Sequence, residues 1–529
     1  MVGGVSTDAS GEFSPLLEAH SSDITIANRD TSDDYNDGYA LLNEELDFSR
    51  TDMIKQEMHW LVKSSIPVSL SYLVQLSFNS FSLLNVGRLG VTELAAASLG
   101  LMLANFLIYM PGYGLACALE SFCGAAFTAS ADKTRVGMHA QRGLVAITLM
   151  LLPILFVLYY IDDILVHFGQ SPEMAKLSSR FLRIWSIGCW PMLAFESLKR
   201  FLQSMNIMQV STWVTFIVAP FHVIISYMLV WSSTIGVGFI GMPLGMTISN
   251  WMLFIGISGY IVFSKARHAW GEFSLECMNG ISEYYRIAIP GALMMALSWA
   301  AMEITTLGAA MYGSVAVAAQ ACVFSSTCVT YQLSSAIGSA VAARIGHCLG
   351  EGKQRRACIA SNVSLVLNYV IYICLALLLI YYRDTWGYIY SDDDKVIAMC
   401  ARLAPCFAFA ILFDGLNGQA AGVMRALGRQ KLGSILAFPS YWIIGMPFGV
   451  FLAKNFAGLD SLGLFVGLTT GMAVFAMSQE CFMLFFVDWK KEVKICLDRL
   501  ARSTKAVQAA SSESADPLHS SLEGYGTIV

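Results

Sequence analysis

The sequence predicts an all-α polytopic membrane protein with twelve transmembrane helices in two six-helix lobes related by a parallel repeat. Three observations predict this class. Of 529 residues, 56% are hydrophobic and only 13% are charged, whereas a soluble globular chain carries about 25% charged residues. Long apolar runs alternate with short polar loops, and landmarks of the first half recur in the second. This composition excludes a soluble enzyme, a disordered scaffold and a typical nucleic-acid-binding protein.

Each apolar run is long enough to cross the hydrocarbon core as a helix, which takes about 20 residues. Alternation at period two is absent from these runs, so helices rather than barrel strands are indicated. The first run begins near residue 61, and we therefore expect no N-terminal signal peptide. The runs are 61–84, 94–118, 143–161, 181–203, 210–231, 238–263, 286–311, 316–342, 361–382, 398–423, 433–453 and 462–487.

Lysine and arginine are concentrated in the loops that follow even-numbered runs, for example Lys133, Lys265 and Arg356. Fewer follow odd-numbered runs, for example Arg383 and Lys454. Because basic loops stay on the cytosolic side, this bias predicts that both termini are cytosolic.

The two ends of the chain differ from its apolar body. Residues 1–57 hold thirteen acids against three bases, whereas the remainder carries 30 bases and 25 acids. This polar, acidic segment predicts a disordered cytosolic tail at 1–57. The remaining expected domains are an N-terminal lobe at 58–263, an interlobe cytosolic loop at 264–285, a C-terminal lobe at 286–487 and a cytosolic tail at 488–529.

An internal repeat relates the two halves at a nearly constant offset of 221 to 223 residues. The matching pairs are Pro67 with Pro290, Gly90 with Gly313, Gly124 with Gly346, and Gln209 with Gln430. Because six spans is an even number, the second copy enters the membrane in the same direction as the first. Such a repeat is related by an axis along the membrane normal, which places a substrate cavity between the lobes and favours alternating access.

Five motifs, spread over residues 61–487, carry a resemblance to one transporter family. They are Val86–Gly90, Ala118–Phe127, Arg200–Gln203, Ala343–Gly352 and Asp414–Leu416. The chain resembles multidrug and toxic compound extrusion (MATE) transporters of eukaryotic type. The resemblance implies a secondary active antiporter that exports organic cations, drugs or amphipathic metabolites in exchange for protons, with sodium less favoured, by alternating access of two lobes around a cavity.

The seventh run departs from the family pattern, which often has Glu-Trp-Trp followed by a second Glu. Here the corresponding stretch begins with Ser298 and Trp299 and ends with Glu303, so the first acid is missing. Positions 298 and 303 lie about 140° apart around a helix. Glu303 therefore cannot occupy the face of the missing acid, and the departure shifts attention to Glu303 and Asp414.

Ionisable side chains inside a span are costly to bury and are functional candidates. Glu303 shares its helix face with Trp299 and Thr306, a surface suited to a cavity. Asp414 is followed one turn later by Asn417 and is expected in the same lobe as Glu303. We expect Glu303 and Asp414 to bind protons in competition with a cationic substrate; a structural hydrogen bond or a polar clasp between helices is the alternative.

Four further polar residues are candidates for the cavity. Glu196 precedes Lys199 and Arg200 at the spacing of helical ion pairs, so a local pair is favoured over a cavity role. Glu120 has either a cavity role or a role at the helix exit. Gln75 and Asn79, in the first run, are candidates for the opposite side of the cavity.

Prolines and aromatic residues complete the candidate site. Pro67 and Pro290 each remove a helical hydrogen bond and permit bending, although a static kink is equally compatible with the sequence. Six aromatic residues are candidates for cation–π contact with substrate: Tyr72, Phe78, Phe81, Trp299, Tyr331 and Phe407. His222 is expected to be a buried, hydrogen-bonded histidine.

The acidic tail holds two copies of an acid followed three residues later by a leucine pair, at Leu16–Leu17 and Leu41–Leu42. This pattern resembles dileucine sorting signals for the vacuole or lysosome, which an adaptor binds. It favours a vacuolar or lysosomal membrane, with the plasma membrane as the alternative.

Two other functions fit the sequence less well. A flippase or transporter of lipid-linked or polyanionic metabolites needs cavity-lining bases, whereas several charges deep in the spans are acidic. A membrane enzyme needs a nucleophile or metal cluster, and no metal-ligand spacing recurs among the thirteen cysteines and eight histidines. We therefore expect a monomeric transporter in the bilayer, with a small-molecule substrate and protons as partners, and with no cofactor, metal or nucleic acid.

Overall fold

The fold was obtained as a computed structural model, which describes residues 49–502 apart from residues 274 and 457–458. The leucine pairs Leu16–Leu17 and Leu41–Leu42, the tail up to residue 48 and the tail beyond residue 502 lie outside the described residues. Every predicted apolar run coincides with a helical segment, which confirms the fold class. Among the described residues, ten segments are long and apolar enough to cross a membrane. The other two, α3 and α8, are more polar.

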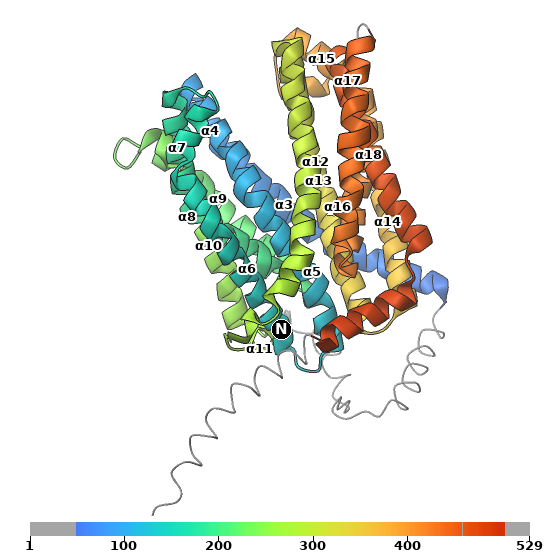
Figure 1. Cartoon of the computed structure of the whole chain (residues 1–529). Helices are drawn as coiled ribbons and strands as arrows, with labels where there is room; N and C mark the ends of the chain where they lie inside the picture. Colours follow the sequence, from blue (N-terminus) through green and yellow to red (C-terminus); the bar gives the residue numbers. More distant parts are fainter. Residues whose placement is uncertain (1–48, 274, 457–458, 503–529) are drawn as a thin grey trace, which may run out of the picture. The chain divides into compact units, whose positions relative to one another are not determined.

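The first lobe contains the first six spans, and Figure 1 shows most of its helices together in blue to green. Its segments are α3 (Arg50–Gly87); α4 (Val91–Ala104), η1 (Asn105–Tyr109) and α5 (Met110–Ala129), which form one span; α6 (Thr134–Tyr159) with the short α7 (Ile161–His167); α8 (Pro172–Ser204); α9 (Gln209–Trp231); and η2 (Gly238–Ile240) with α10 (Gly241–Phe263).

The second lobe repeats this order in yellow-green to red. Its segments are α12 (Ile281–Ala309) with η4 (Ala310–Tyr312); α13 (Ser314–Gly350); α14 (Gln354–Tyr381) with η5 (Trp386–Ile389); α15 (Asp394–Leu427); α16 (Gln430–Phe438), η6 (Pro439–Gly445) and α17 (Met446–Asn455); and α18 (Asp460–Cys481) with η7 (Phe482–Phe486). The short α11 (Ala266–Trp270) and η3 (Leu275–Met278) lie between the lobes in the chain.

Local sequence sets several helix ends. Ser171 precedes α8 and accepts a hydrogen bond from the Met174 amide, with Pro172 at the first helical position. Asp393 caps α15 by accepting from the Lys395 amide at 2.8 Å. At its other end α15 stops at Gly428, whose φ of 69° lies in the left-handed region that glycine adopts without strain.

The lobes pack together through a symmetric set of helices. α3 packs against α13 and, in the equivalent arrangement, α12 packs against α5, while α5 and α13 pack against each other. Gly124 of α5 faces Gly346 of α13 so closely that a Cβ on either would lie 3.2–3.3 Å from the other's Cα. These two glycines are one of the pairs predicted by the repeat, so equivalent residues meet as they do in a twofold interface.

The predicted boundaries of both tails need correction. Residues 50–57 are the first turns of α3, and residues 489–502 form a further helix. Glu57, assigned to the tail, is fully buried because Arg344 and Arg356 both pair with it. Glu492 is buried and pairs with Arg429. Partners far away in sequence compensate these charges, and composition could not reveal those partners.

Candidate functional site

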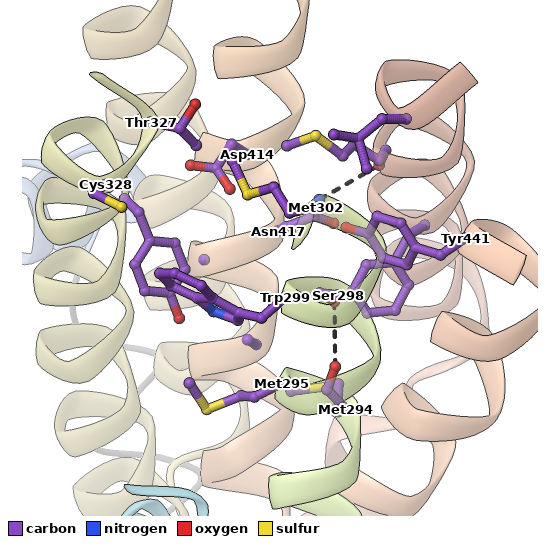
Figure 2. Close-up of a pocket in the computed structure, with 16 residues that line it drawn as sticks. Met294, Met295, Ser298, Trp299, Met302, Thr327, Cys328, Asp414, Asn417 and Tyr441 are labelled. Carbon is purple, nitrogen blue, oxygen red and sulfur yellow. Dashed lines mark hydrogen bonds between the residues drawn. The ribbon is translucent and has the colours of Figure 1, made fainter. Parts of the chain in front are cut away.

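The candidate site is a cavity among helices of the second lobe, here called the main cavity. Segments α12, α13, α15, η6 and α18 line it. This cavity lies within one lobe, whereas a cavity between the lobes was expected. A second, smaller pocket does lie between the lobes and is lined by Glu120, Arg200 and Ser339 among others. Figure 2 shows Trp299, Met302 and Asp414 around this cavity. The lining residues are Met294, Met295, Ser298, Trp299, Met302, Thr327, Cys328, Tyr331, Asp414, Asn417, Gly418, Ala421, Tyr441, Leu468, Met472 and Phe475.

Asp414 is the acidic residue of this lining. Its side chain is 8% exposed, and its Oδ2 atom is buried without a hydrogen-bond partner. An ionised carboxylate that is buried without a partner costs several kcal/mol, so this site favours exchange between a charged, solvated form and a neutral, buried one. The titratable groups within electrostatic range of Asp414 include Cys328, Tyr331, Tyr372 and Tyr441.

Two predicted residues join Asp414 at the cavity. Asn417 lies one turn away on α15, donates to the Met472 carbonyl at 3.4 Å and accepts from Gln479 at 3.3 Å. Trp299 packs edge-to-face against Tyr331, with ring centroids 5.6 Å apart. The cavity lining therefore combines one acid, one amide, four aromatic residues and four methionines.

Serine at position 298 fills the place of the acid in the family pattern. Its hydroxyl donates to the Met294 carbonyl at 3.2 Å and interacts with the Tyr441 hydroxyl. Glu303 lies one turn beyond Trp299 on α12, is half-buried and is not among the lining residues. It shares one neighbour with Asp414, because both carboxyl groups lie within electrostatic range of Cys328.

The structure does not bring Gln75 or Asn79 to this cavity. Gln75 donates to Ser71 on its own helix at 3.1 Å, and Asn79 is exposed. Pro67 and Pro290 lie inside helices that continue through them. The Pro67 carbonyl accepts a hydrogen bond from Thr212 of α9 at 2.5 Å, which ties this part of α3 to its neighbour.

Of the predicted aromatic residues, only Trp299 and Tyr331 line the cavity. Phe407 packs against Trp386 in the core of the second lobe, and Phe78 stacks on His222. His222 is hydrogen-bonded to Ser249 and Ser82, as expected for a buried histidine. Tyr72 lies in a polar network between the lobes.

This interlobe network contains Glu120 and Glu196. Glu196 pairs with Lys199 at 2.5 Å and with Arg200 at 2.7 Å, which confirms the predicted local pairs. Glu120 of α5 accepts from Arg425 of α15 at 2.6 Å and lies 3.4 Å from Arg200. Glu120 therefore connects the two lobes; it lies outside the lining of the cavity in the second lobe but lines the smaller pocket between the lobes.

Further interlobe contacts lie near the same ends of the helices. The Ser339 hydroxyl donates to Glu120 at 3.2 Å and is within hydrogen-bonding distance of Tyr72. His347 hydrogen-bonds to the Ser204 carbonyl, and Thr128 donates to the His347 carbonyl at 3.0 Å. We call this region, where α5, α8, α13 and α15 end, the joined end.

Sequence reasoning missed several residues of these sites. Glu480 lies inside the predicted run 462–487, so the rule that flagged Glu303 applied to it as well, whereas Arg425 lies just beyond the predicted run 398–423 and inside α15 only in the structure. The Glu480 Oε1 atom is buried without a partner. Glu57 carried no such signal, because its importance depends on Arg344 and Arg356 of the other lobe. In the part of the chain that the structure describes, no three His, Cys, Asp or Glu residues gather where they could hold a metal ion.

Two repeated six-span lobes around polar sites within a membrane define a multi-pass membrane transporter rather than an enzyme. The family model MatE matches residues 67–228 and 290–451. The chain belongs to the MatE family, which confirms the resemblance stated above.

Relatives and solved structures agree with this family. "Uncharacterized transporter C323.07c" of Schizosaccharomyces pombe is 30% identical over 449 residues, covering 85% of this chain and 84% of the relative. "Multidrug and toxin extrusion protein 1" of Oryctolagus cuniculus is 29% identical and covers 87% and 79%. The crystal structure of the eukaryotic MATE transporter AtDTX14 matches with a TM-score of 0.79 at 24% identity, covering 84% of this chain and 99% of that one.

Proposed function

We propose that this transporter is a proton-coupled antiporter that exports amphipathic organic cations, with Asp414 as the group that binds the proton. The observation that carries the proposal is the buried Asp414 carboxyl, which lines the cavity and leaves Oδ2 without a hydrogen-bond partner. A proton or a cationic substrate can each neutralise that carboxylate, and the two therefore compete. Glu303 is the second proton-binding candidate in the same lobe.

The cavity lining supports an amphipathic cation as substrate. Methionine side chains are flexible and polarisable, so Met294, Met295, Met302 and Met472 can adapt to varied apolar groups. The rings of Trp299 and Tyr331 supply cation–π contact. The name of the rabbit relative, a multidrug and toxin extrusion protein, is consistent with such a substrate class.

A polyanionic substrate is less well supported. The buried bases Lys199, Arg200 and Arg425 each pair with a glutamate at the joined end. A pyrophosphate group would have to compete with these carboxylates. The main cavity instead presents Asp414, an acid, to the bound molecule.

The proposed orientation places the joined end and both termini in the cytosol, because the basic loops lie after the even-numbered spans. We propose that the cavity then exchanges substrate with the opposite side, because the lobes are held together at the joined end. We propose a vacuolar or lysosomal membrane, reached through an adaptor that binds Leu16–Leu17 or Leu41–Leu42, and a monomer as the working unit.

Purified protein in proteoliposomes tests the coupling. An imposed pH gradient is expected to drive uptake of organic cations against their concentration gradient, and a sodium gradient at constant pH is not. A panel of cations, neutral amphiphiles and anions sets the substrate class. Uptake driven equally well without a pH gradient, or uptake of anions alone, would overturn the proposal.

Replacing Trp299 with Ala is expected to raise the KM for a cationic substrate by about tenfold, because a desolvated cation–π contact contributes about 1–2 kcal/mol. Trp299→Phe keeps an aromatic face and should recover most of the affinity. Trp251→Ala is a matched control, since Trp251 packs against Trp190 and Phe254 in the first lobe. An unchanged KM in Trp299→Ala would exclude direct substrate contact.

A further inference from the structure

The Glu120–Arg425 ion pair connects the two lobes on buried side chains. Arg425 Nε donates to Glu120 Oε2 at 2.6 Å, and both side chains are less than 10% exposed. The Ser121 hydroxyl also donates to the Arg425 carbonyl, and Gln430 donates to Ser121. The end of α15 is therefore held against α5 by both its side chain and its backbone.

The two partners of this ion pair are anchored unequally. Glu120 also contacts Arg200 at 3.4 Å, and Arg200 is held by Glu196 in the same lobe. If the lobes separate at the joined end, Glu120 keeps a cation beside it, whereas Arg425 loses its paired carboxylate and gains water. The pair can therefore break without leaving a buried carboxylate unpaired. This matters because an unpaired buried charge is strongly destabilising.

Arg425 and Asp414 lie on the same continuous helix. Eleven residues separate them on α15, which corresponds to about 16 Å along the helix axis. Asp414 lines the cavity, and Arg425 lies at the joined end. A shift or rotation of α15 that accompanies a change at Asp414 therefore also moves Arg425.

Because α13 and α15 pack closely against each other, we expect them to move together. A Cβ on Gly422 would collide with the backbone of Gly338, and a Cβ on Gly418 would collide with Ser334. Small residues four apart allow such close contact between membrane helices. The Ser334 hydroxyl also bonds to the Asp414 carbonyl at 3.3 Å. The α13–α15 pair thus links Asp414 to the interlobe contacts of both helices.

We propose that Glu120 and Arg425 form an interlobe latch, and that the α13–α15 pair couples the latch to the proton-binding state of Asp414. Glu120 and Arg425 are then positioning residues for the exchange between conformations. The coupling to Asp414 rests on the proposed function, whereas the latch itself does not. Two sites in a protein are coupled when each of them shifts the same equilibrium between two conformations. Here the sites are Asp414 and the latch, and the equilibrium is between lobes in contact and lobes apart at the joined end.

A native thiol reports whether the joined end opens. Cys348 of α13 is 1% exposed and packs in a cluster with Ala125 of α5 and Leu61 of α3. Cys123 is fully buried within the first lobe, where its thiol lies 3.8 Å from the Val136 carbonyl, and reports loss of the lobe's own fold. The rates at which N-ethylmaleimide modifies both thiols are measured by peptide mass spectrometry on purified protein without substrate.

The Arg425→Gln variant is expected to raise the Cys348 modification rate by about tenfold while Cys123 stays protected. Arg383→Gln, an exposed change near the opposite end of the second lobe, should leave both rates unchanged. If Arg425→Gln exposes both thiols, the variant has lost its fold. In that case Glu120→Gln, which keeps the shape of the side chain, is the variant that tests the latch. Unchanged protection of Cys348 in Glu120→Gln, or in a folded Arg425→Gln, would overturn the latch.

A double-mutant comparison tests the coupling. Asp414→Asn should change the Cys348 rate when the latch is intact and have little effect when Arg425 is Gln. Equal effects of Asp414→Asn in both backgrounds would overturn the coupling and leave the latch. Because no substrate or gradient is present, failure of the latch is separate from failure of proton-driven transport.

Discussion

Replacing Asp414 with Asn is expected to abolish transport driven by a pH gradient, to the level of vesicles without protein. Asparagine has the shape of the protonated acid but cannot release a proton. The side chain is buried and Oδ2 has no partner, so no neighbouring carboxylate in direct contact with it can take over the exchange. Folding should not suffer, because a neutral amide avoids the cost of a buried charge. Uptake in proteoliposomes and the melting temperature in detergent measure the two effects.

A matched control lies on the same helix. Asp394 is exposed in the first turn of α15, and Asp394→Asn should leave pH-driven uptake unchanged. Glu303→Gln separates the two candidate acids, since it should reduce uptake if Glu303 binds the second proton. Full proton-driven uptake by Asp414→Asn would show that Asp414 does not bind the coupling proton.

Replacing Glu196 with Gln is expected to destabilise the protein by about 3–5 kcal/mol, which is the cost of removing one partner from a buried ion pair. Lys199 and Arg200 are both fully buried, and each pairs with Glu196. After the substitution, Lys199 loses its paired carboxylate, while its ammonium still lies 4.1 Å from the Tyr72 ring centroid. Thermal unfolding in detergent should show a clearly lower melting temperature.

Glu173 provides the matched control for this substitution. It is exposed in the first turn of the same helix, so Glu173→Gln should have little effect on the melting temperature. Adding Lys199→Gln to Glu196→Gln removes the unpaired charge and should recover part of the lost stability. A Glu196→Gln protein that melts with the wild type would mean that the pair contributes no net stability.

Hydrophobic length made most of the fold predictable. Spanning a bilayer requires about 20 apolar residues per helix, and this requirement leaves its pattern directly in the sequence. The repeat gave a further check, because Gly124 and Gly346 were paired by offset alone and meet in the structure. The ends of the spans were less predictable. The charged start of α3 has the composition of a polar tail, and only the folded structure shows that Arg344 and Arg356 pair with Glu57 there.

The candidate site was predictable in part. Burial cost singled out Asp414, and its spacing to Asn417 placed both residues on one side of α15. The same rule could not say that Glu120 would bond to Arg425, 305 residues away, or that Gln75 and Asn79 would lie outside the cavity lining. A rule based on hydropathy evaluates the cost of placing the residues of one helix in lipid. The cavity lining depends instead on how five segments face one another.

The sequence by itself determined the membrane class, the spans, the parallel repeat and the acids that are expensive to bury. These follow from hydropathy and spacing along one chain. Only the tertiary structure decided which charges are paired, that the cavity lies inside the second lobe, and that α15 joins Asp414 to the interlobe contact through Arg425. The physical reason is that the cost of a buried charge depends on its partner, and these partners come from helices that meet only in the folded protein.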